Sequence, residues 1–180
     1  MGRAAAFTAE KLVIGVLTSR PERKAEIADA LALRWGPADY SGEPFPFTFT
    51  SYYDEEMGVP ISRFFLSFER LIDPSRLAAI KKETNALEEH WREKGARMVN
   101  LDPGFLALSR FTLATTKESA HRIPLADGIF AEITLLWHKG SFQPLPWTYP
   151  DFRSERYQSI LNAIRARYKT QLDAGPGRRS

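Results

Sequence analysis

The order in which strand-like and helix-like patterns follow one another constrains the fold of this chain most. Residues 11–18 are a short, almost continuous apolar run, which is typical of a strand buried on both faces. Residues 19–35 then have helical spacing, with Pro21 in the first turn and Gly36 as the stop. The chain is therefore expected to begin with a central strand followed by a helix.

The middle of the chain repeats this alternation. Residues 38–50 contain two prolines and predict either an edge strand or an ordered loop, with three phenylalanines on the core face: Phe45, Phe47 and Phe49. Residues 63–72 alternate apolar and polar side chains, as a half-buried strand does. Asp73-Pro74 then supplies the cap and first-turn proline of a helix that runs to Gly95, the longest helix expected.

The second half of the chain begins with a short strand over residues 97–101. Residues 105–117 fit either a helix or a strand, and the cap and proline of Asp102-Pro103-Gly104 before them favour a short helix. Asp127-Gly128 stands between two strand-like runs and is typical of a two-residue hairpin turn. The chain then continues with a proline-rich loop and an amphipathic helix, over residues 143–150 and 152–172.

The element order β-α-β-β-α-β is that of a ferredoxin-like sandwich, here extended by a C-terminal β-hairpin and a final α-helix. This α+β fold suits a single domain over residues 11–173, because no linker rich in proline, glycine or serine separates two possible cores. Residues 1–10 are expected to be a disordered N-terminus, and residues 174–180 a disordered basic tail.

Composition excludes several classes of protein. The chain has no cysteine, which excludes disulfide scaffolds, cysteine-based zinc sites, iron–sulfur clusters and thiol nucleophiles. No apolar run reaches the roughly 20 residues of a membrane-spanning helix, and residues 1–10 lack the apolar core of a secretory signal. We therefore expect a cytoplasmic protein without a membrane segment. The net charge of +3 lies partly in the tail, so a nucleic-acid partner is supported only weakly.

A hairpin that turns at Asp127-Gly128 places polar side chains on one face of residues 121–125 and 129–138. These are His121, Glu132, Thr134 and His138, opposite an apolar face expected to pack on the core: Ile129, Ala131, Ile133, Leu135 and Trp137. The first two are diagonal neighbours, so the carboxylate could orient the imidazole for general acid–base chemistry. Because exposed sheet faces are normally polar, we expect instead a solvated polar face with one structural hydrogen bond.

Polar side chains also gather between residues 100 and 122, where the ends of predicted elements meet. They are Asn100, Asp102, Thr115, Thr116, Lys117, His121 and Arg122. Hydroxyl, ammonium and guanidinium groups at element ends are what a phosphate or carboxylate ligand requires. Each motif alone also has a structural explanation, because Asp102 could cap a helix and Lys117 could be a favourable cation at a helix end. Their crowding favours an anion site.

Two aromatic segments could border such a site. Residues 50–58 place adjacent tyrosines before three acids and could cover a ligand, with Tyr53 or Glu56 reaching inward. A solvated turn with packed tyrosines is the alternative. Residues 144–151 are rigid and aromatic, so they could form a pocket wall, present a docking surface or anchor the helix that follows.

Familiar catalytic motifs are absent from the sequence. It contains no Gly-x4-Gly-Lys-Ser/Thr phosphate loop, no Gly-x-Gly-x-x-Gly fingerprint and no Gly-x-Ser-x-Gly elbow. His90, His121 and His138 share no metal-ligand spacing, so no metal site is predicted, although His121 together with carboxylates remains an alternative. No particular cofactor and no oligomeric state can be assigned from these residues.

Several long motifs occur in a fixed order along the chain: Phe45-Pro-Phe-Thr-Phe-Thr-Ser-Tyr-Tyr53, Glu55-Glu-Met-Gly58, Asn100-Leu-Asp-Pro-Gly104, Leu113-Ala-Thr-Thr-Lys117, His121-Arg-Ile123 and Pro144-Leu-Pro-Trp-Thr-Tyr-Pro-Asp151. In these motifs the chain resembles an uncharacterised prokaryotic family catalogued as domain of unknown function 4416. The resemblance covers residues 11–172. It implies no established activity and carries no catalytic role to any residue.

Two hypotheses of function follow. The first is an enzyme or ligand-binding protein for an anionic metabolite or nucleotide. Its acid–base or orienting residues would be His121, Asp102, Glu132 and Tyr53, and its ligand-binding residues Asn100, Thr115, Thr116, Lys117, Arg122 and Glu56. The second is a non-enzymatic RNA-binding or protein-interaction adaptor that uses the sheet and a basic helix face. That face carries Arg153, Arg156, Arg165, Arg167 and Lys169, and solvation alone also explains it.

Overall fold

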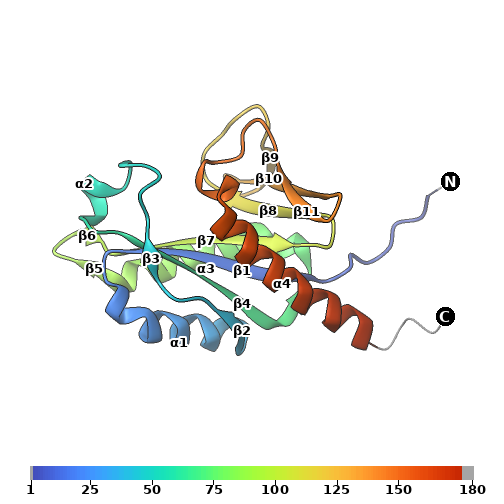
Figure 1. Cartoon of the computed structure of the whole chain (residues 1–180), viewed down its shortest axis with the longest axis horizontal. Coiled ribbons are helices and arrows are strands. Elements are labelled where there is room, and N and C mark those ends of the chain that lie inside the picture. The colour runs from blue at the N-terminus through green and yellow to red at the C-terminus, as the bar shows by residue number, and fades with distance from the viewer. Residues whose placement is uncertain (1, 176–180) are drawn as a thin grey trace.

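The computed structural model describes residues 2–175, which form a large sheet with helices on both faces (Figure 1). The strands of this sheet are β1 (Glu10–Thr18), β2 (Ala38–Ser41), β3 (Phe45–Pro46), β4 (Ser62–Ile72), β7 (Val99–Leu106), β8 (Arg110–Thr115), β9 (Ile123–Ala126), β10 (Ile129–His138) and β11 (Ser141–Pro144). A separate small hairpin joins β5 (Arg92–Glu93) to β6 (Ala96–Arg97).

Within residues 2–175 the large sheet has nine strands, and their order is β11-β10-β8-β7-β1-β4-β2. The short strands β3 and β9 pair with β4 and β10. All of these pairings are antiparallel. Every residue of β1 is buried, which confirms the prediction of a buried central strand from its continuous apolar run.

The helices are α1 (Lys24–Trp35), the single turn α2 (Asp54–Met57), α3 (Leu77–Glu88) and α4 (Glu155–Ala174). Short 3₁₀ turns occupy Pro21–Arg23, Pro74–Arg76, Glu89–Trp91 and Asp151–Arg153. As expected, the Asp73 carboxylate caps its turn by accepting a hydrogen bond from the Ser75 amide at 2.8 Å. The longest helix is α4 with 20 residues, whereas α3 has 12, so the prediction that α3 is the longest was wrong.

That prediction failed because the chain turns back before residue 95. After Glu88 the helix narrows into a 3₁₀ turn and then enters the β5–β6 hairpin. The hairpin turn places Lys94 and Gly95 at positive φ, of 50° and 87°, a conformation that cannot continue a helix.

Two apolar cores lie on opposite faces of the sheet. Alternate side chains of β1, among them Ile14, pack with α1 and α3 on one face. The intervening Val13 packs with Tyr157 and Leu161 of α4 on the other. Figure 1 shows α4 crossing the sheet on its own side. A smaller third cluster joins the end of β1 to the segment around α2, through Leu17, Phe47, Met57 and Ile61.

Strand β4 is buried on both faces, so the prediction of a half-buried strand was wrong. Phe64 packs with α1 and α3, as its alternation predicted. The opposite face is also covered, because Phe65 packs against Tyr157 of α4. Arg63 and Ser67, expected to be solvated, are only 3% and 0% exposed. Their polar groups make hydrogen bonds within the protein instead.

Residues 105–117 form strands rather than the predicted helix. β7 continues through Pro103 and Gly104 to Leu106, and β8 returns beside it as a hairpin. A Cβ atom placed on Gly104 would lie only 2.6 Å from the carbonyl oxygen of Thr112. The glycine therefore serves the close approach of two strands, and the sequence Asp-Pro-Gly does not cap a helix here.

Gly104→Ala is expected to lower the free energy of unfolding by about 2–3 kcal/mol, because the new methyl group must push β8 away from β7. Urea denaturation at neutral pH measures the change. Gly2→Ala is the matched control, since a Cβ atom at Gly2 meets nothing within 4 Å. A loss for Gly104→Ala no larger than that of the control would show that the two strands have room to separate.

The hairpin turn at Asp127-Gly128 is confirmed, with φ angles of 54° and 74°. The register begins as predicted, with Ala126 opposite Ile129, but then shifts by one residue at Phe130. The expected solvated face is wrong, because Glu132 is 1% exposed and Thr134 is 0% exposed.

The loop that follows β11 covers this polar face of β10. The Thr148 hydroxyl donates a hydrogen bond to the Thr134 carbonyl, and the Trp147 indole N–H donates to the Ile133 carbonyl at 2.8 Å. A second register shift, between Ile133 and Leu135, divides the predicted apolar face. Ile129 packs on the α1 and α3 side, whereas Leu135 packs on the α4 side.

Other expectations concern exposed positions and the two ends of the chain. Phe49 is 40% exposed, unlike Phe45 and Phe47, so its placement on the core was wrong. Within residues 2–175, no helix is both long enough and apolar enough to cross a bilayer. Residues 2–9 have no regular secondary structure, and residue 174 ends α4. The predicted basic tail beyond residue 175 lies outside the described residues.

Candidate functional site

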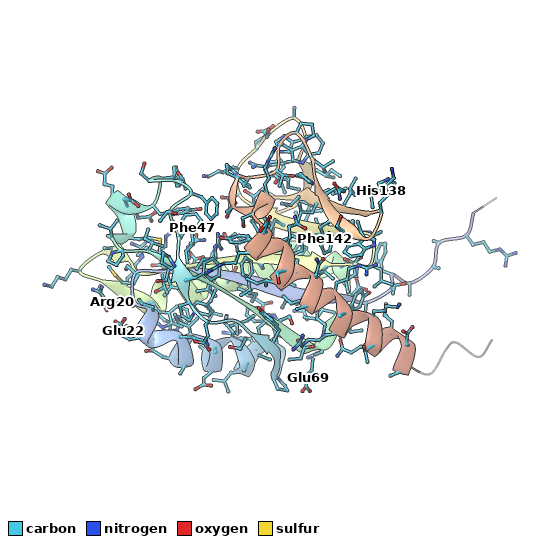
Figure 2. The ribbon with its side chains drawn as sticks, in the orientation of Figure 1. Arg20, Glu22, Phe47, Glu69, His138 and Phe142 are labelled. Atoms are coloured by element: carbon cyan, nitrogen blue, oxygen red, sulfur yellow. The ribbon has the colours of Figure 1, made fainter. Side chains whose placement is uncertain are left out.

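A cavity of about 440 Å³ opens beside the segment that joins β3 to α2. We call it the aromatic cavity, because rings from two parts of the chain line it: Phe47, Phe49, Tyr52, Tyr53, Tyr149 and Phe152. Phe47 lies near α2 in Figure 2. The Arg63, Asp102 and Asp151 side chains also line this cavity, so a largely apolar space contains a small charged group.

A second cavity of about 330 Å³ lies between α3, the β5–β6 hairpin and the ends of β7 and β8. We call it the polar cavity, because charged and amide side chains line it: Glu56, Lys81, Glu88, Arg92, Arg97 and Asn100. The side chains of Tyr52, Tyr53, Asp102, Thr115 and Lys117 line both cavities. The two spaces therefore adjoin along one border.

The carboxylates of the polar cavity already have cationic partners. Arg97 pairs with Glu56 at 2.7 Å and with Glu88 at 3.1 Å. Arg92 pairs with Glu89 at 2.7 Å. The ammonium of Lys81 has its own internal acceptor, the Leu101 carbonyl at 2.8 Å. Most charged side chains of the polar cavity are therefore already paired within the protein.

Lys117 differs from these groups. Its ammonium lies over the Tyr52 ring, 4.1 Å from the ring centroid, and no carboxylate of residues 2–175 forms an ion pair with it. The backbone of the same residue is fixed, because its amide donates to the Thr115 hydroxyl at 3.1 Å. A cation without a carboxylate partner at the border of two cavities is suited to an anionic ligand.

The charged group of the aromatic cavity is centred on Arg63, which is buried. Its guanidinium lies 2.9 Å from the Asp102 carboxylate and 3.5 Å from that of Asp151, and it donates to the Tyr157 hydroxyl at 3.1 Å. The same guanidinium lies over the Phe47 ring, 5.3 Å from its centroid. One cation thus compensates two carboxylates whose charged forms burial disfavours.

The two carboxyl groups beside Arg63 differ in their affinity for protons. Burial raises the pKa of Asp151, and the attraction of Arg63 only partly offsets this. Burial also acts on Asp102, but Arg63 and Lys81 outweigh it and the pKa falls below its ordinary value. Burial and the nearby Asp102 raise the pKa of Tyr53, so its phenol stays protonated at neutral pH. Asp102 therefore stays ionised at neutral pH and can accept hydrogen bonds, and Tyr53 can donate one.

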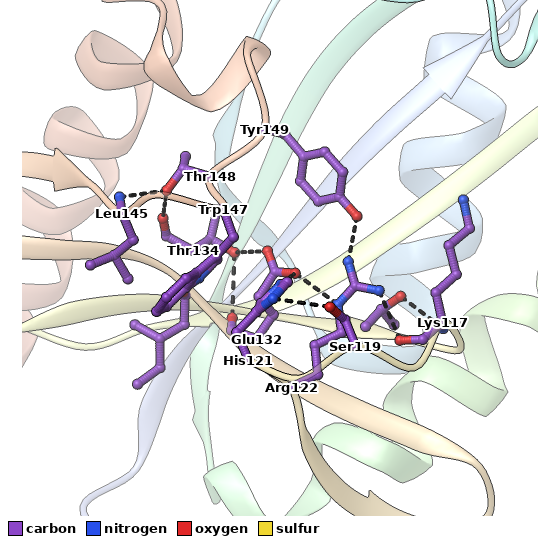
Figure 3. A network of polar contacts seen from close by, with 12 residues as sticks. Lys117, Ser119, His121, Arg122, Glu132, Thr134, Leu145, Trp147, Thr148 and Tyr149 are labelled. Carbon is purple, nitrogen blue, oxygen red and sulfur yellow. Dashed lines mark hydrogen bonds and ion pairs between the residues drawn. The ribbon is translucent and has the colours of Figure 1, made fainter.

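His121 and its partners form a separate network (Figure 3). His121 Nε2 lies 3.0 Å from Glu132 Oε2, and Nδ1 lies 3.1 Å from the Ser119 hydroxyl. The imidazole also stacks on Trp147, with ring centroids 4.9 Å apart and planes 14° apart. The expected His121–Glu132 pair is thus present, although it sits under the loop that follows β11 and lines neither cavity.

Arg122 connects this network to the cavities. Its Nε donates to Glu132 Oε2 at 2.8 Å, while its terminal nitrogens donate to the Lys117 carbonyl at 2.8 Å and the Tyr149 hydroxyl at 2.7 Å. Lys117 and Tyr149 both line the aromatic cavity. Arg122 and Glu132 therefore hold two parts of the cavity wall at a fixed separation.

Tyr149→Phe is expected to lower the free energy of unfolding by about 1 kcal/mol, because Arg122 loses one acceptor. The loss should vanish when Arg122 is already methionine, and a double-mutant cycle in urea measures this coupling. Tyr52→Phe is the matched control, since the Tyr52 hydroxyl forms no hydrogen bond with any group of residues 2–175. Additive losses for the Arg122 and Tyr149 variants would show that the bond does not support the wall.

Most of the residues expected to form one site do meet. Those that line the polar cavity are Tyr53, Glu56, Asn100, Asp102, Thr115, Thr116 and Lys117. His121, Arg122 and Glu132 form the neighbouring network, and His138 lies apart at the outer end of β10, next to the β10–β11 turn (Figure 2).

The structure also adds residues to this site that the sequence did not indicate, above all Arg63, Asp151, Arg97 and Glu88. One available signal was the lone arginine that precedes the apolar residues 64–66 of β4, where a buried charge needs carboxylate partners. In residues 2–175 no three histidine, aspartate or glutamate side chains gather in a way that could hold a metal ion.

The chain is an α+β domain with an antiparallel sheet, helices on both faces, and two adjoining cavities near the ends of β7 and β8. Residues 8–168 match the family described as "Domain of unknown function (DUF4416)". The chain belongs to this family, which confirms the resemblance seen in its motifs. Neither the curated proteins nor the solved structures include a match.

Proposed function

We propose that this protein binds a small anionic metabolite or nucleotide at the border of the aromatic and polar cavities. The observation that carries the proposal is the Lys117 ammonium, which lines both cavities and has no carboxylate partner in residues 2–175. Cavity volumes of about 440 and 330 Å³ lie in the range of small-molecule sites.

The groups around Lys117 suit the same ligand. The Thr115 and Thr116 hydroxyls and the Asn100 amide line the polar cavity and can donate hydrogen bonds to ligand oxygens. If the protein is an enzyme, the ionised Asp102 orients the ligand by accepting hydrogen bonds and the protonated Tyr53 by donating one, in keeping with the directions of their pKa shifts. His121, Arg122 and Glu132 then act as support for the cavity wall.

A thermal-shift screen of anionic metabolites tests this proposal. A ligand that binds only the folded protein raises its melting temperature by mass action. At least one phosphorylated or carboxylated compound is expected to raise the melting temperature of the wild type and not that of Lys117→Ala. No shift with any compound, or equal shifts in both proteins, would contradict the proposal.

The adaptor hypothesis has less support from the residues it requires. Arg153 donates to the Thr148 carbonyl at 2.8 Å, Arg165 lies over Trp137 at 3.6 Å, and Arg167 donates to the Asp39 carbonyl at 2.9 Å. Arg165 and Arg167 thus hold α4 on the sheet, and Arg153 holds the 3₁₀ turn before α4 to the preceding loop. What favours the adaptor is the exposure of Trp147 and Tyr149, at 38% and 41%. RNA affinity that falls steeply with salt would support it.

We also infer that residues 10–106 form a ferredoxin-like unit. The strand order β7-β1-β4-β2 is supporting evidence, because it corresponds to the order 4-1-3-2 in the β-α-β-β-α-β series of expected elements. The packing of α1 and α3 in one core on one face is a second point in its favour. Strands β8 to β11 and α4 would then be additions to this unit.

A further inference from the structure

We infer that the ligand carries a flat aromatic ring joined to its anionic group, with the ring in the aromatic cavity and the anion at Lys117. This inference rests on the proposed function and names the chemical class of the ligand. It follows from the side chains that line the two cavities on either side of their border.

The aromatic cavity presents ring surfaces that the protein itself does not fully cover. Phe49 lies beside Phe47, with centroids 5.8 Å apart, and Tyr52 meets Tyr53 edge-on at 5.0 Å. Yet Phe49 is 40% exposed and Tyr52 is 62% exposed. Apolar surface that stays open within a concave site is a binding surface for apolar ligand atoms, and neighbouring rings favour another ring over an aliphatic chain.

The cation stands directly at the edge of this aromatic surface. The Lys117 ammonium is 4.1 Å from the centroid of the Tyr52 ring, and both side chains line both cavities. Arg122 holds the Lys117 carbonyl at 2.8 Å, so the backbone that carries this cation is fixed. A ring beside Phe49 and Tyr52 would thus have its substituent directed to Lys117.

The charged group beneath the rings adds a further requirement. Asp102 and Asp151 line the aromatic cavity, and each carboxylate oxygen can accept more than one hydrogen bond. Arg63 and the Asn100 amide donate to Asp102 at 2.9 and 2.8 Å, whereas Asp151 accepts from the Phe152 N–H at 3.0 Å and lies 3.5 Å from Arg63. A ring with N–H or amino donors on its edge would use the positions that remain, whereas a pure hydrocarbon ring would leave these carboxylates less well solvated.

Two matched sets of probes test this inference by isothermal titration calorimetry with the full chain. The first set is adenosine 5′-monophosphate, adenosine and ribose 5-phosphate. The second is indole-3-acetate, indole and acetate. In at least one set the joined molecule is expected to bind at least about 10-fold more tightly than either of its fragments. Once one fragment is bound, the covalent link gives the other a high effective concentration at its own part of the site. The set that does so identifies phosphate or carboxylate as the anion.

Two variants separate the ring from the anion. Phe49→Ala is expected to weaken the joined probe by about 10-fold and leave the ring-free anion unchanged, since stacking on one aromatic side chain contributes about this much to the binding of a base. Phe7→Ala is the matched control, because Phe7 is exposed and lines neither cavity.

Each remaining outcome contradicts one claim. If a ring-free anion binds as tightly as the joined probe and Lys117→Ala abolishes its binding, the ring inference is wrong and the proposed function stands. If the ring alone binds as tightly as the joined probe, the anion contributes nothing and the proposed function fails. If no probe of either set binds, the inference is overturned for both phosphates and carboxylates.

Discussion

Arg63→Met is expected to lower the free energy of unfolding by about 3–5 kcal/mol, because it leaves two carboxylates without their cation. Arg63 is 3% exposed and pairs with Asp102 and Asp151. Methionine fills a similar volume, so the loss reflects the missing charge and hydrogen bonds more than an empty space. Urea denaturation at neutral pH gives the change in free energy.

The triple variant Arg63→Met, Asp102→Asn, Asp151→Asn is the control for this interpretation. It removes the charges of all three groups and keeps their approximate shapes, so it should recover part of the stability lost in Arg63→Met. The deficit of the single variant should also shrink as pH falls, because protonation neutralises the stranded carboxyl groups. A loss below about 1 kcal/mol, equal at every pH, would show that Arg63 is not the centre of a buried charge network.

Lys117→Ala is expected to weaken the anionic ligand by about 10- to 100-fold, the contribution of one charge-assisted hydrogen bond. The stability of the folded protein should change little, because no carboxylate of residues 2–175 depends on this ammonium. Calorimetric titration of wild type and variant with the compound that gives the largest thermal shift measures the difference. The loss should be smaller at high salt, where the attraction is screened.

Lys169→Ala is the matched control for Lys117→Ala. It removes the same charge from an exposed position of α4 that lines neither cavity. Its affinity for the ligand should equal that of the wild type. Equal losses in both variants would mean that the net charge of the protein attracts the ligand, and that Lys117 has no special place in the site.

The sequence predicted well those elements whose apolar pattern matches their burial. Residues 11–18 read as a buried strand and are one, and Asp127-Gly128 turns a hairpin as its residue types require. The prediction for residues 105–117 failed because Pro103 and Gly104 have two uses. They begin helices in many proteins, whereas here the glycine admits the Thr112 carbonyl of a neighbouring strand. That contact depends on the pairing of β7 with β8, which the residues around Gly104 do not reveal.

The candidate site was predicted in part for a related reason. Asn100, Asp102 and Thr115 were grouped because they lie near the ends of predicted elements, and they do line the same cavity. Glu132 was expected on a solvated face, but the loop after β11 buries it, which alternation within one hairpin cannot reveal. Arg63 was overlooked because its partners are 39 and 88 residues away along the chain.

The central claim is that the two cavities form one ligand site at Lys117. Two titrations of nitrogen-labelled protein, one with adenosine 5′-monophosphate and one with indole-3-acetate, test it most directly when they are followed by proton–nitrogen NMR. With at least one of the two compounds, the account predicts saturable shifts of the amide signals of Tyr52, Tyr53, Thr115, Thr116 and Lys117, and their loss in Lys117→Ala. Saturable shifts confined to α4, or no saturable shift at any amide with either compound, would contradict it.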